Sequence, residues 1–156
     1  MGRMLVQSDY EDMLQSLNDN KARYCIVGSF ALAFHATPRY TKDMDILVEP
    51  TMENGRRIVN ALDQFGFGEI DLMPEDFSEE NNIIQLGFEP VRIDLITSLP
   101  GLTFENVWQD RVMGVYGNTH TQFISRTHLI LSKQNAGRPQ DLLDVAALQA
   151  NMPPEA

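Results

Sequence analysis

The order of apolar and polar residues predicts an α+β fold with a mixed, partly antiparallel sheet flanked by helices. Two pairs of strand-like segments, 83–88 with 91–96 and 112–116 with 119–124, are each separated by a tight turn, as antiparallel hairpins are. Strands and helices do not alternate strictly along the chain, which argues against a doubly wound parallel sheet. With 156 residues, 43% of them apolar, we expect one domain over residues 1–156.

The first half of the chain predicts helices and two short strands before the first hairpin. A helix is expected to begin at Ser8, because apolar residues recur after it at helical spacing. Segment 69–82 has six acidic residues and no basic one, so we expect a solvated loop or the margin of a strand. Between these lie a strand over 24–27, a helix over 29–35, a strand over 45–48, and a helix whose apolar stripe is Met52, Ile58, Leu62 and Phe65.

The second half adds helices after each hairpin. Thr103 is a suitable N-cap for a helix that continues through Arg111. Pro139 suits the first turn of the last helix, where a missing N–H costs nothing. The two final helices are expected over 125–134 and 139–149.

The charge of the chain excludes some functions. It has 12 basic and 22 acidic residues and a net charge of −10, so we expect no general DNA or RNA binding. The same charge makes a basic protein partner possible. No apolar run approaches the roughly 18 residues of a membrane span, and we expect a cytoplasmic protein without membrane contact. The single cysteine, Cys25, has apolar neighbours that place it in the core.

Gly28 and Ser29 lie where the expected strand 24–27 passes into the expected helix 29–35. The N-terminus of a helix offers free N–H groups and the positive end of a dipole, which together bind phosphate. Gly28 would let a ligand approach the backbone, and Ser29 would add a hydroxyl donor. The same pair also fits a turn in which Ser29 is only an N-cap. Both interpretations stay open at this point.

Asp43 and Asp45 are candidate catalytic or metal-binding acids. Residues two apart on a strand point to one face, about 6.5–7 Å from each other. The two carboxylates would then converge, while Met44, Ile46 and Val48 pack on the opposite face. Such close carboxylates repel unless a cation lies between them, and Mg²⁺ takes ligands of this kind. Two exposed acids at a strand end are the simpler alternative.

Asp94 interrupts a strongly apolar strand, with Ile93 and Leu95 expected on the opposite face. A buried lone carboxylate is costly unless it is paired or bound to a metal. Arg92 lies on the same face and could serve only as its ion-pair partner. A phosphate-binding turn, a pair of carboxylates and a third carboxylate together are the parts of a two-metal phosphoryl-transfer site, which favours the metal interpretation.

These residues resemble the signature of the polymerase-β-like nucleotidyltransferase superfamily. The chain is most similar to the small bacterial branch that includes the abortive-infection nucleotidyltransferase toxins, and the resemblance spans about residues 24–148. The matching motifs are Gly28-Ser29, Arg39-x-Thr41-x-Asp43-x-Asp45, Asp94, Ser132-Lys133, Gly137-Arg138 and Asp141-x-x-Asp144.

The resemblance implies a nucleotidyltransferase fold and a role for each residue of the motifs. Gly28 and Ser29 would hold the terminal phosphates of an NTP. Asp43 and Asp45 would bind two Mg²⁺ ions, and Asp94 would serve the ion nearer the nucleophile.

The remaining residues of the motifs have less defined roles in the resemblance. Lys133 would contact the triphosphate or the sugar. Arg39 would contact phosphate or serve as a structural ion-pair partner. Asp141 and Asp144 would orient Lys133, cap local helices or contact the substrate.

The expected function is Mg²⁺-dependent transfer of a nucleoside monophosphate from an NTP to a hydroxyl, with release of pyrophosphate. The acceptor could be RNA, a protein or a small molecule, because no motif defines it. The alternative is a non-catalytic nucleotide-binding module or a toxin–antitoxin interaction module.

Overall fold

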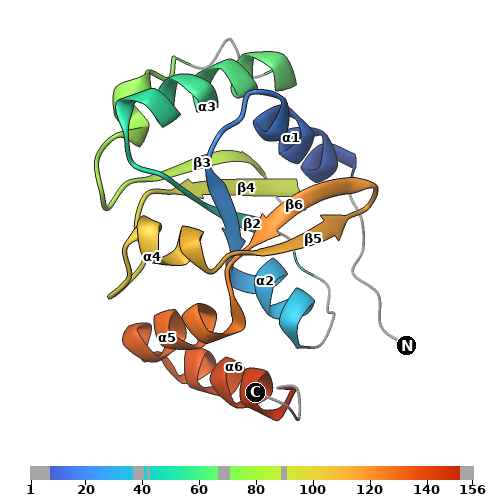
Figure 1. Cartoon of the computed structure of the whole chain (residues 1–156), viewed down its shortest axis with the longest axis vertical. Helices are drawn as coiled ribbons and strands as arrows, with labels where there is room; N and C mark the ends of the chain where they lie inside the picture. The colour runs from blue at the N-terminus through green and yellow to red at the C-terminus, as the bar shows by residue number, and fades with distance from the viewer. Residues whose placement is uncertain (1–7, 37–40, 42, 67–70, 89–90, 152–156) are drawn as a thin grey trace.

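A mixed six-stranded sheet forms the centre of the part of the chain that the computed structural model describes, residues 8–36, 41, 43–66, 71–88 and 91–151 (Figure 1). The strand order is β3-β4-β2-β1-β6-β5. Pairs β1–β2, β3–β4 and β5–β6 are antiparallel, and β2–β4 and β1–β6 are parallel, which confirms the predicted mixed sheet. The strands are β1 Tyr24–Val27, β2 Asp43–Val48, β3 Ile83–Phe88, β4 Val91–Ile96, β5 Val112–Tyr116 and β6 Thr119–Phe123.

Helices cover the sheet in two groups (Figure 1). Helices α1 and α3 contact each other on one side of the sheet, and α5 pairs with α6 on the other side, next to α2. Among the described residues, no helix has the length and apolar content needed to cross a bilayer. The helices are α1 Ser8–Asp19, α2 Gly28–His35, α3 Met52–Phe65, the 3₁₀ turn η1 Pro74–Phe77, α4 Phe104–Gln109, α5 Arg126–Ala136 and α6 Pro139–Ala150.

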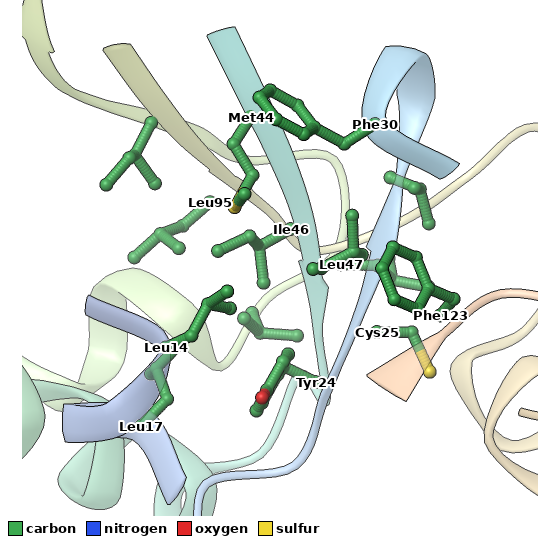
Figure 2. Packing of buried hydrophobic residues seen from close by; sticks show 14 of the residues in the cluster. Leu14, Leu17, Tyr24, Cys25, Phe30, Met44, Ile46, Leu47, Leu95 and Phe123 are labelled. Carbon is green, nitrogen blue, oxygen red and sulfur yellow. The ribbon is translucent and has the colours of Figure 1, made fainter. Parts of the chain in front are cut away.

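The core lies on both faces of the central strands (Figure 2). Leu14 and Leu17 of α1 face Ile46 of β2, and all three side chains are buried. Burial of each such side chain contributes about 1.5–3 kcal/mol to folding. On the opposite face, Cys25 contacts the core beside Leu47, and burial raises the pKa of its thiol to about 12. The predicted core position of Cys25 is therefore confirmed.

The alternation along β2 places its acids on one face. Met44, Ile46 and Val48 are fully buried, as predicted, so Asp43 and Asp45 point to the other face. The strand begins at Asp43, two residues earlier than the predicted segment 45–48. Both acids are consequently held by the ladder of backbone hydrogen bonds and not by a loop.

Two other predicted elements differ from the structure in kind or in length. The acidic segment 69–82, predicted to be a loop or the margin of a strand, contains η1, whose Phe77 is completely buried. The helix expected to continue through Arg111 ends at Gln109, and Arg111 lies beyond it, with its guanidinium 3.7 Å from the centroid of the Trp108 ring. The N-cap prediction at Thr103 is confirmed, since its side chain accepts a hydrogen bond from the Asn106 N–H.

Candidate active site

Three carboxylates meet where β2 and β4 lie side by side. The two strands are parallel neighbours, and Asp45 is directly opposite Asp94 in their register. Asp43 precedes Asp45 by two residues and points to the same face. One oxygen from each of the three carboxylates lies within 4.8 Å of the others. The structure therefore brings together acids that are about fifty residues apart in the chain.

The negative charge of this cluster is only partly neutralised. Arg92 donates to both oxygens of Asp94, from Nε at 3.1 Å and from Nη2 at 2.9 Å. Burial, followed by repulsion from Asp94 and Asp43, raises the pKa of Asp45 to about 6, although Arg92 and Lys133 act in the opposite direction. Asp94 is thus both an ion-pair partner of Arg92 and a member of the acidic cluster, and the two interpretations of its role are compatible.

Gly28 is needed at its position because Asp45 lies directly against it. Its φ is +65°, and a Cβ atom built there would overlap Oδ2 of Asp45. Helix α2 begins at Gly28, and its N-cap is Val27, which has no side-chain cap hydrogen bond. The interpretation of Ser29 as a plain N-cap is therefore wrong. The first N–H groups of α2 have no partner within the helix and lie beside the acidic cluster.

The C-terminal motif forms a chain of ion pairs between α5 and α6. The Lys133 ammonium lies 2.8 Å from Oδ2 of Asp144 and 3.9 Å from Oδ1 of Asp141. Asp141 also accepts from Arg138, from the side chain at 2.7 Å and from the backbone N–H at 3.2 Å. The Arg138 guanidinium holds the pKa of Asp141 below its ordinary value. Both acids therefore pair with Lys133, and Asp141 also caps α6, while a contact of either acid with the substrate stays a prediction.

A cavity of about 800 Å³ connects these groups. Gly28, Asp45, Asp94 and Lys133 all line it, so four of the predicted site residues share one space. Asp43 and Ser29 are outside its lining. Asp43 nevertheless lies in the acidic cluster with Asp45, and Ser29 directly follows Gly28 in the chain. The prediction for Arg39 falls on a residue outside the described part of the chain.

Sequence reasoning missed the far wall of the cavity. It consists of residues from the start of β3, the end of β4 and the loop after β4. These residues are amides, a hydroxyl and aliphatic side chains, and no motif of charged or nucleophilic groups distinguishes them in the sequence. The members of this wall are Asn81, Asn82, Ile83, Ile96, Ser98, Leu99 and Leu102.

Comparison with known proteins places the chain among the nucleotidyltransferases. Residues 4–150 match the family model described as "Nucleotidyltransferase of unknown function (DUF6036)", and the chain belongs to this family. The structure is similar to the crystal structure of the lincosamide antibiotic adenylyltransferase LnuA with lincomycin bound. The TM-score is 0.58 at 11% identity, covering 96% of this chain and 100% of that one, a likeness of fold alone. No curated protein matches the chain.

Proposed function

We propose that the protein transfers a nucleoside monophosphate from an NTP to a hydroxyl acceptor in a Mg²⁺-dependent reaction that releases pyrophosphate. The observation that carries this proposal is the convergence of Asp43, Asp45 and Asp94 within 4.8 Å, with two of them on the wall of the cavity that Gly28 and Lys133 also line. Membership of a nucleotidyltransferase family supports nucleotidyl transfer in general. The metal ions and the direction of transfer are inferred from the chemistry of the residues.

The residues present fit divalent cations. Carboxylate oxygens are the ligands that Mg²⁺ prefers. The pKa of Asp45 is raised first by burial and then by the charges of Asp94 and Asp43, which Arg92 and Lys133 oppose. Asp43 and Asp45 would hold two ions, and Asp94 would hold the one nearer the nucleophile. When bound, such a pair neutralises charge on the attacking and leaving oxygens of an in-line displacement.

The bonds that change are defined by the reaction class. The acceptor oxygen forms a bond to the α-phosphorus, and the bond from that phosphorus to the oxygen bridging to the β-phosphate breaks. Pyrophosphate leaves with the bonding electron pair, and the hydroxyl proton passes to Asp94 or to water. Gly28 and Ser29 would direct N–H and hydroxyl donors at the terminal phosphates.

Lys133 would contact the triphosphate from α5. Its ammonium is held in place by Asp144, at 2.8 Å, so it is oriented before the nucleotide binds. Such preorganisation reduces the entropy cost of binding. A phosphate contact of Arg39 stays a prediction from the resemblance.

The acceptor is a separate part of the proposal. The similar fold of a lincosamide antibiotic adenylyltransferase bound to lincomycin supports a small-molecule acceptor. The −10 net charge of this chain is unfavourable for an RNA acceptor, which needs basic residues to contact its phosphates.

Pyrophosphate release tests the proposal. The chain is incubated with each of the four NTPs, Mg²⁺ and a small-molecule filtrate of cell extract as the source of acceptor. We expect the rate with the preferred NTP to fall at least about 100-fold in Asp45→Asn. The matched control is Asp63→Asn, which removes an exposed acid of α3 and should leave the rate unchanged. An Asp45→Asn variant with the wild-type rate would refute the assignment, and NTP binding without any pyrophosphate would favour a non-catalytic module.

A further inference from the structure

The two sides of the cavity differ in chemistry. One side presents the N-terminus of α2 together with Lys133 and Arg138, which are groups suited to phosphates. The other side, which we call the neutral wall, consists of the uncharged residues Asn81, Ile83, Ile96, Ser98, Leu99 and Leu102, and the acidic residue Glu80 lies next to it. The acidic cluster lies between the two sides, because the strand order places β4 with Asp94 and β2 with Asp45 between β3 and β1.

The neutral wall carries apolar surface that nothing in the described part of the chain covers. Ile83 of β3 and Ile96 of β4 are directly opposite each other in the antiparallel ladder. Ile83 is 71% exposed although it is a large aliphatic residue, and Ile96, Leu99 and Leu102 beside it are only half-buried. A concave apolar surface with a few polar groups is typical of ligand sites.

Hydrogen bonds hold this wall in a fixed shape. The backbone N–H of Asn81 donates to Oγ of Ser98 at 3.1 Å, and that hydroxyl donates to Oδ1 of Asn81 at 3.1 Å. On the side of α5, Nδ2 of Asn135 donates to the carbonyl of Pro100 at 2.9 Å. The loop after β4 is therefore attached to both β3 and α5, and the wall is already formed without a ligand.

The strand order determines which substrate reaches this wall. Across the sheet, the order β3-β4-β2-β1 places the neutral wall beyond Asp94, and it places Gly28 on the far side of Asp45. In an in-line displacement, the attacking and leaving oxygens lie on opposite sides of the phosphorus. With pyrophosphate leaving toward Gly28 and Lys133, the acceptor hydroxyl must approach from the side of β3 and β4.

The charges near the wall are unsuited to a polynucleotide. Within the described ranges, the cavity has two basic side chains, Lys133 and Arg138, and both pair with Asp141. Glu80 lies next to Asn81 on the cavity and adds negative charge. The basic residue Arg23 is at the opposite end of β1 from the cavity, where its backbone N–H donates to Asn54.

We infer that the acceptor is a small hydroxyl-bearing molecule with an apolar portion that packs on the neutral wall, and that it is not a polynucleotide. This inference rests on the proposed function, because the direction of attack depends on it. The apolar portion would cover Ile83 and Ile96, and the polar groups of Asn81 and Ser98 would orient the hydroxyl-bearing end toward Asp94.

Nuclear magnetic resonance of the ¹⁵N-labelled full chain, without nucleotide or metal, tests the inference apart from catalysis. The probe is n-hexyl β-D-glucopyranoside, which joins hydroxyls to an apolar tail, and D-glucose is the matched control without the tail. We expect saturable shifts of the amides of residues 81–83 and 98–102. Glucose should bind the wild-type chain about fivefold more weakly than the glucoside does, and the glucoside should bind Ile83→Asn more weakly by the same factor. Because Ile83 is exposed, we expect this variant to fold. Leu143→Asn, on the exposed face of α6, should change nothing.

Three results would overturn the inference. The first is the absence of saturable shifts at the neutral wall in the glucoside titration. The second is a shift of the same amides with unfractionated tRNA. The third is a shift of these amides with any of the four nucleosides, because the wall would then bind the base of the NTP. Failure of the proposed function has a different readout, since it would abolish pyrophosphate release and leave the glucoside titration unaffected.

Discussion

The position of Asp45 depends on the absence of a side chain at Gly28. The Asp45 carboxylate occupies the space that a Cβ atom of residue 28 would need, and the positive φ of Gly28 is one that other residues rarely adopt. Gly28 therefore has a structural role besides the phosphate contact proposed for it. It seats one of the three acids of the candidate site.

Gly28→Ala tests this coupling. We expect a loss of about 1–3 kcal/mol in the free energy of unfolding, from the left-handed backbone and the displaced carboxylate. Pyrophosphate release should fall at least about tenfold, because Asp45 must shift. Gly66→Ala is the matched control: Gly66 also has a positive φ, +114°, but a Cβ atom there would meet no other atom within 4 Å, so stability should fall and activity should not. Equal activity of the two variants would contradict the coupling.

The raised pKa of Asp45 predicts how the stability of the metal-free protein depends on pH. The pKa is about 6 in the folded chain and about 3.9 in the unfolded chain, so between these values the folded state binds more protons. Stability must therefore fall as pH rises from about 4 to about 6.

Thermal unfolding in EDTA measures this effect in Asp45→Asn. The substitution removes the charge, so we expect the melting temperature at about pH 8 to rise by about 2–4 °C relative to the wild type. The difference should shrink toward about pH 4, where the wild-type carboxyl is protonated. A lower melting temperature of the variant at about pH 8 would show that the Asp45 charge is stabilised by its surroundings.

At the scale of elements, the sequence predicts hairpins better than single helix ends. The bounds of β3, β4 and β5 agree with the prediction, because tight turns and apolar runs define both ends of each strand. Beyond the early end of α4, Arg111 donates a hydrogen bond to Gln122 of β6, a contact between elements that no local pattern contains. The turn η1 escapes prediction because its one buried residue, Phe77, stands among acids and shows no period.

The pairing of α5 with α6 gives Lys133 its orientation and leads to a prediction. Lys133→Met should weaken NTP binding at least about tenfold and destabilise the fold, since Asp144 and Asp141 would lose a cation while buried. The double variant Lys133→Met, Asp144→Asn should recover stability but not NTP affinity. Isothermal titration with each NTP and urea unfolding separate the two effects. Recovery of NTP affinity in the double variant would assign Lys133 a purely structural role.

At the scale of the whole molecule, the local patterns of the sequence identify the acids, whereas the expectation that they meet comes from their combined chemistry and from the family resemblance. The spacing of Asp43 and Asp45 and the apolar neighbours of Asp94 indicate each residue separately. Their convergence requires β2 and β4 to pair in parallel with Asp45 opposite Asp94, a register set by the packing of the entire sheet. The neutral wall escapes prediction for a related reason, because its residues become a surface only when β3, β4 and the loop before α4 are assembled.

The net charge of the chain and the acidic cluster both make NTP binding unfavourable in the absence of divalent cations. A chain of net charge −10, with an acidic cluster on its cavity, repels a polyanionic NTP unless divalent cations accompany it. Nucleotide binding should therefore depend on metal binding. The net charge also leaves the binding of a basic protein partner as a prediction.

Counting bound Mn²⁺ on the full chain by electron paramagnetic resonance tests the metal site most directly. The titration includes the α,β-methylene analogue of each NTP, which cannot release pyrophosphate. With the analogue that binds, we predict two Mn²⁺ ions per wild-type chain. The affinity for Mn²⁺ should be at least about tenfold lower in Asp45→Asn and in Asp94→Asn, and it should be unchanged in Asp63→Asn. Undiminished Mn²⁺ binding in Asp45→Asn and Asp94→Asn would contradict the account.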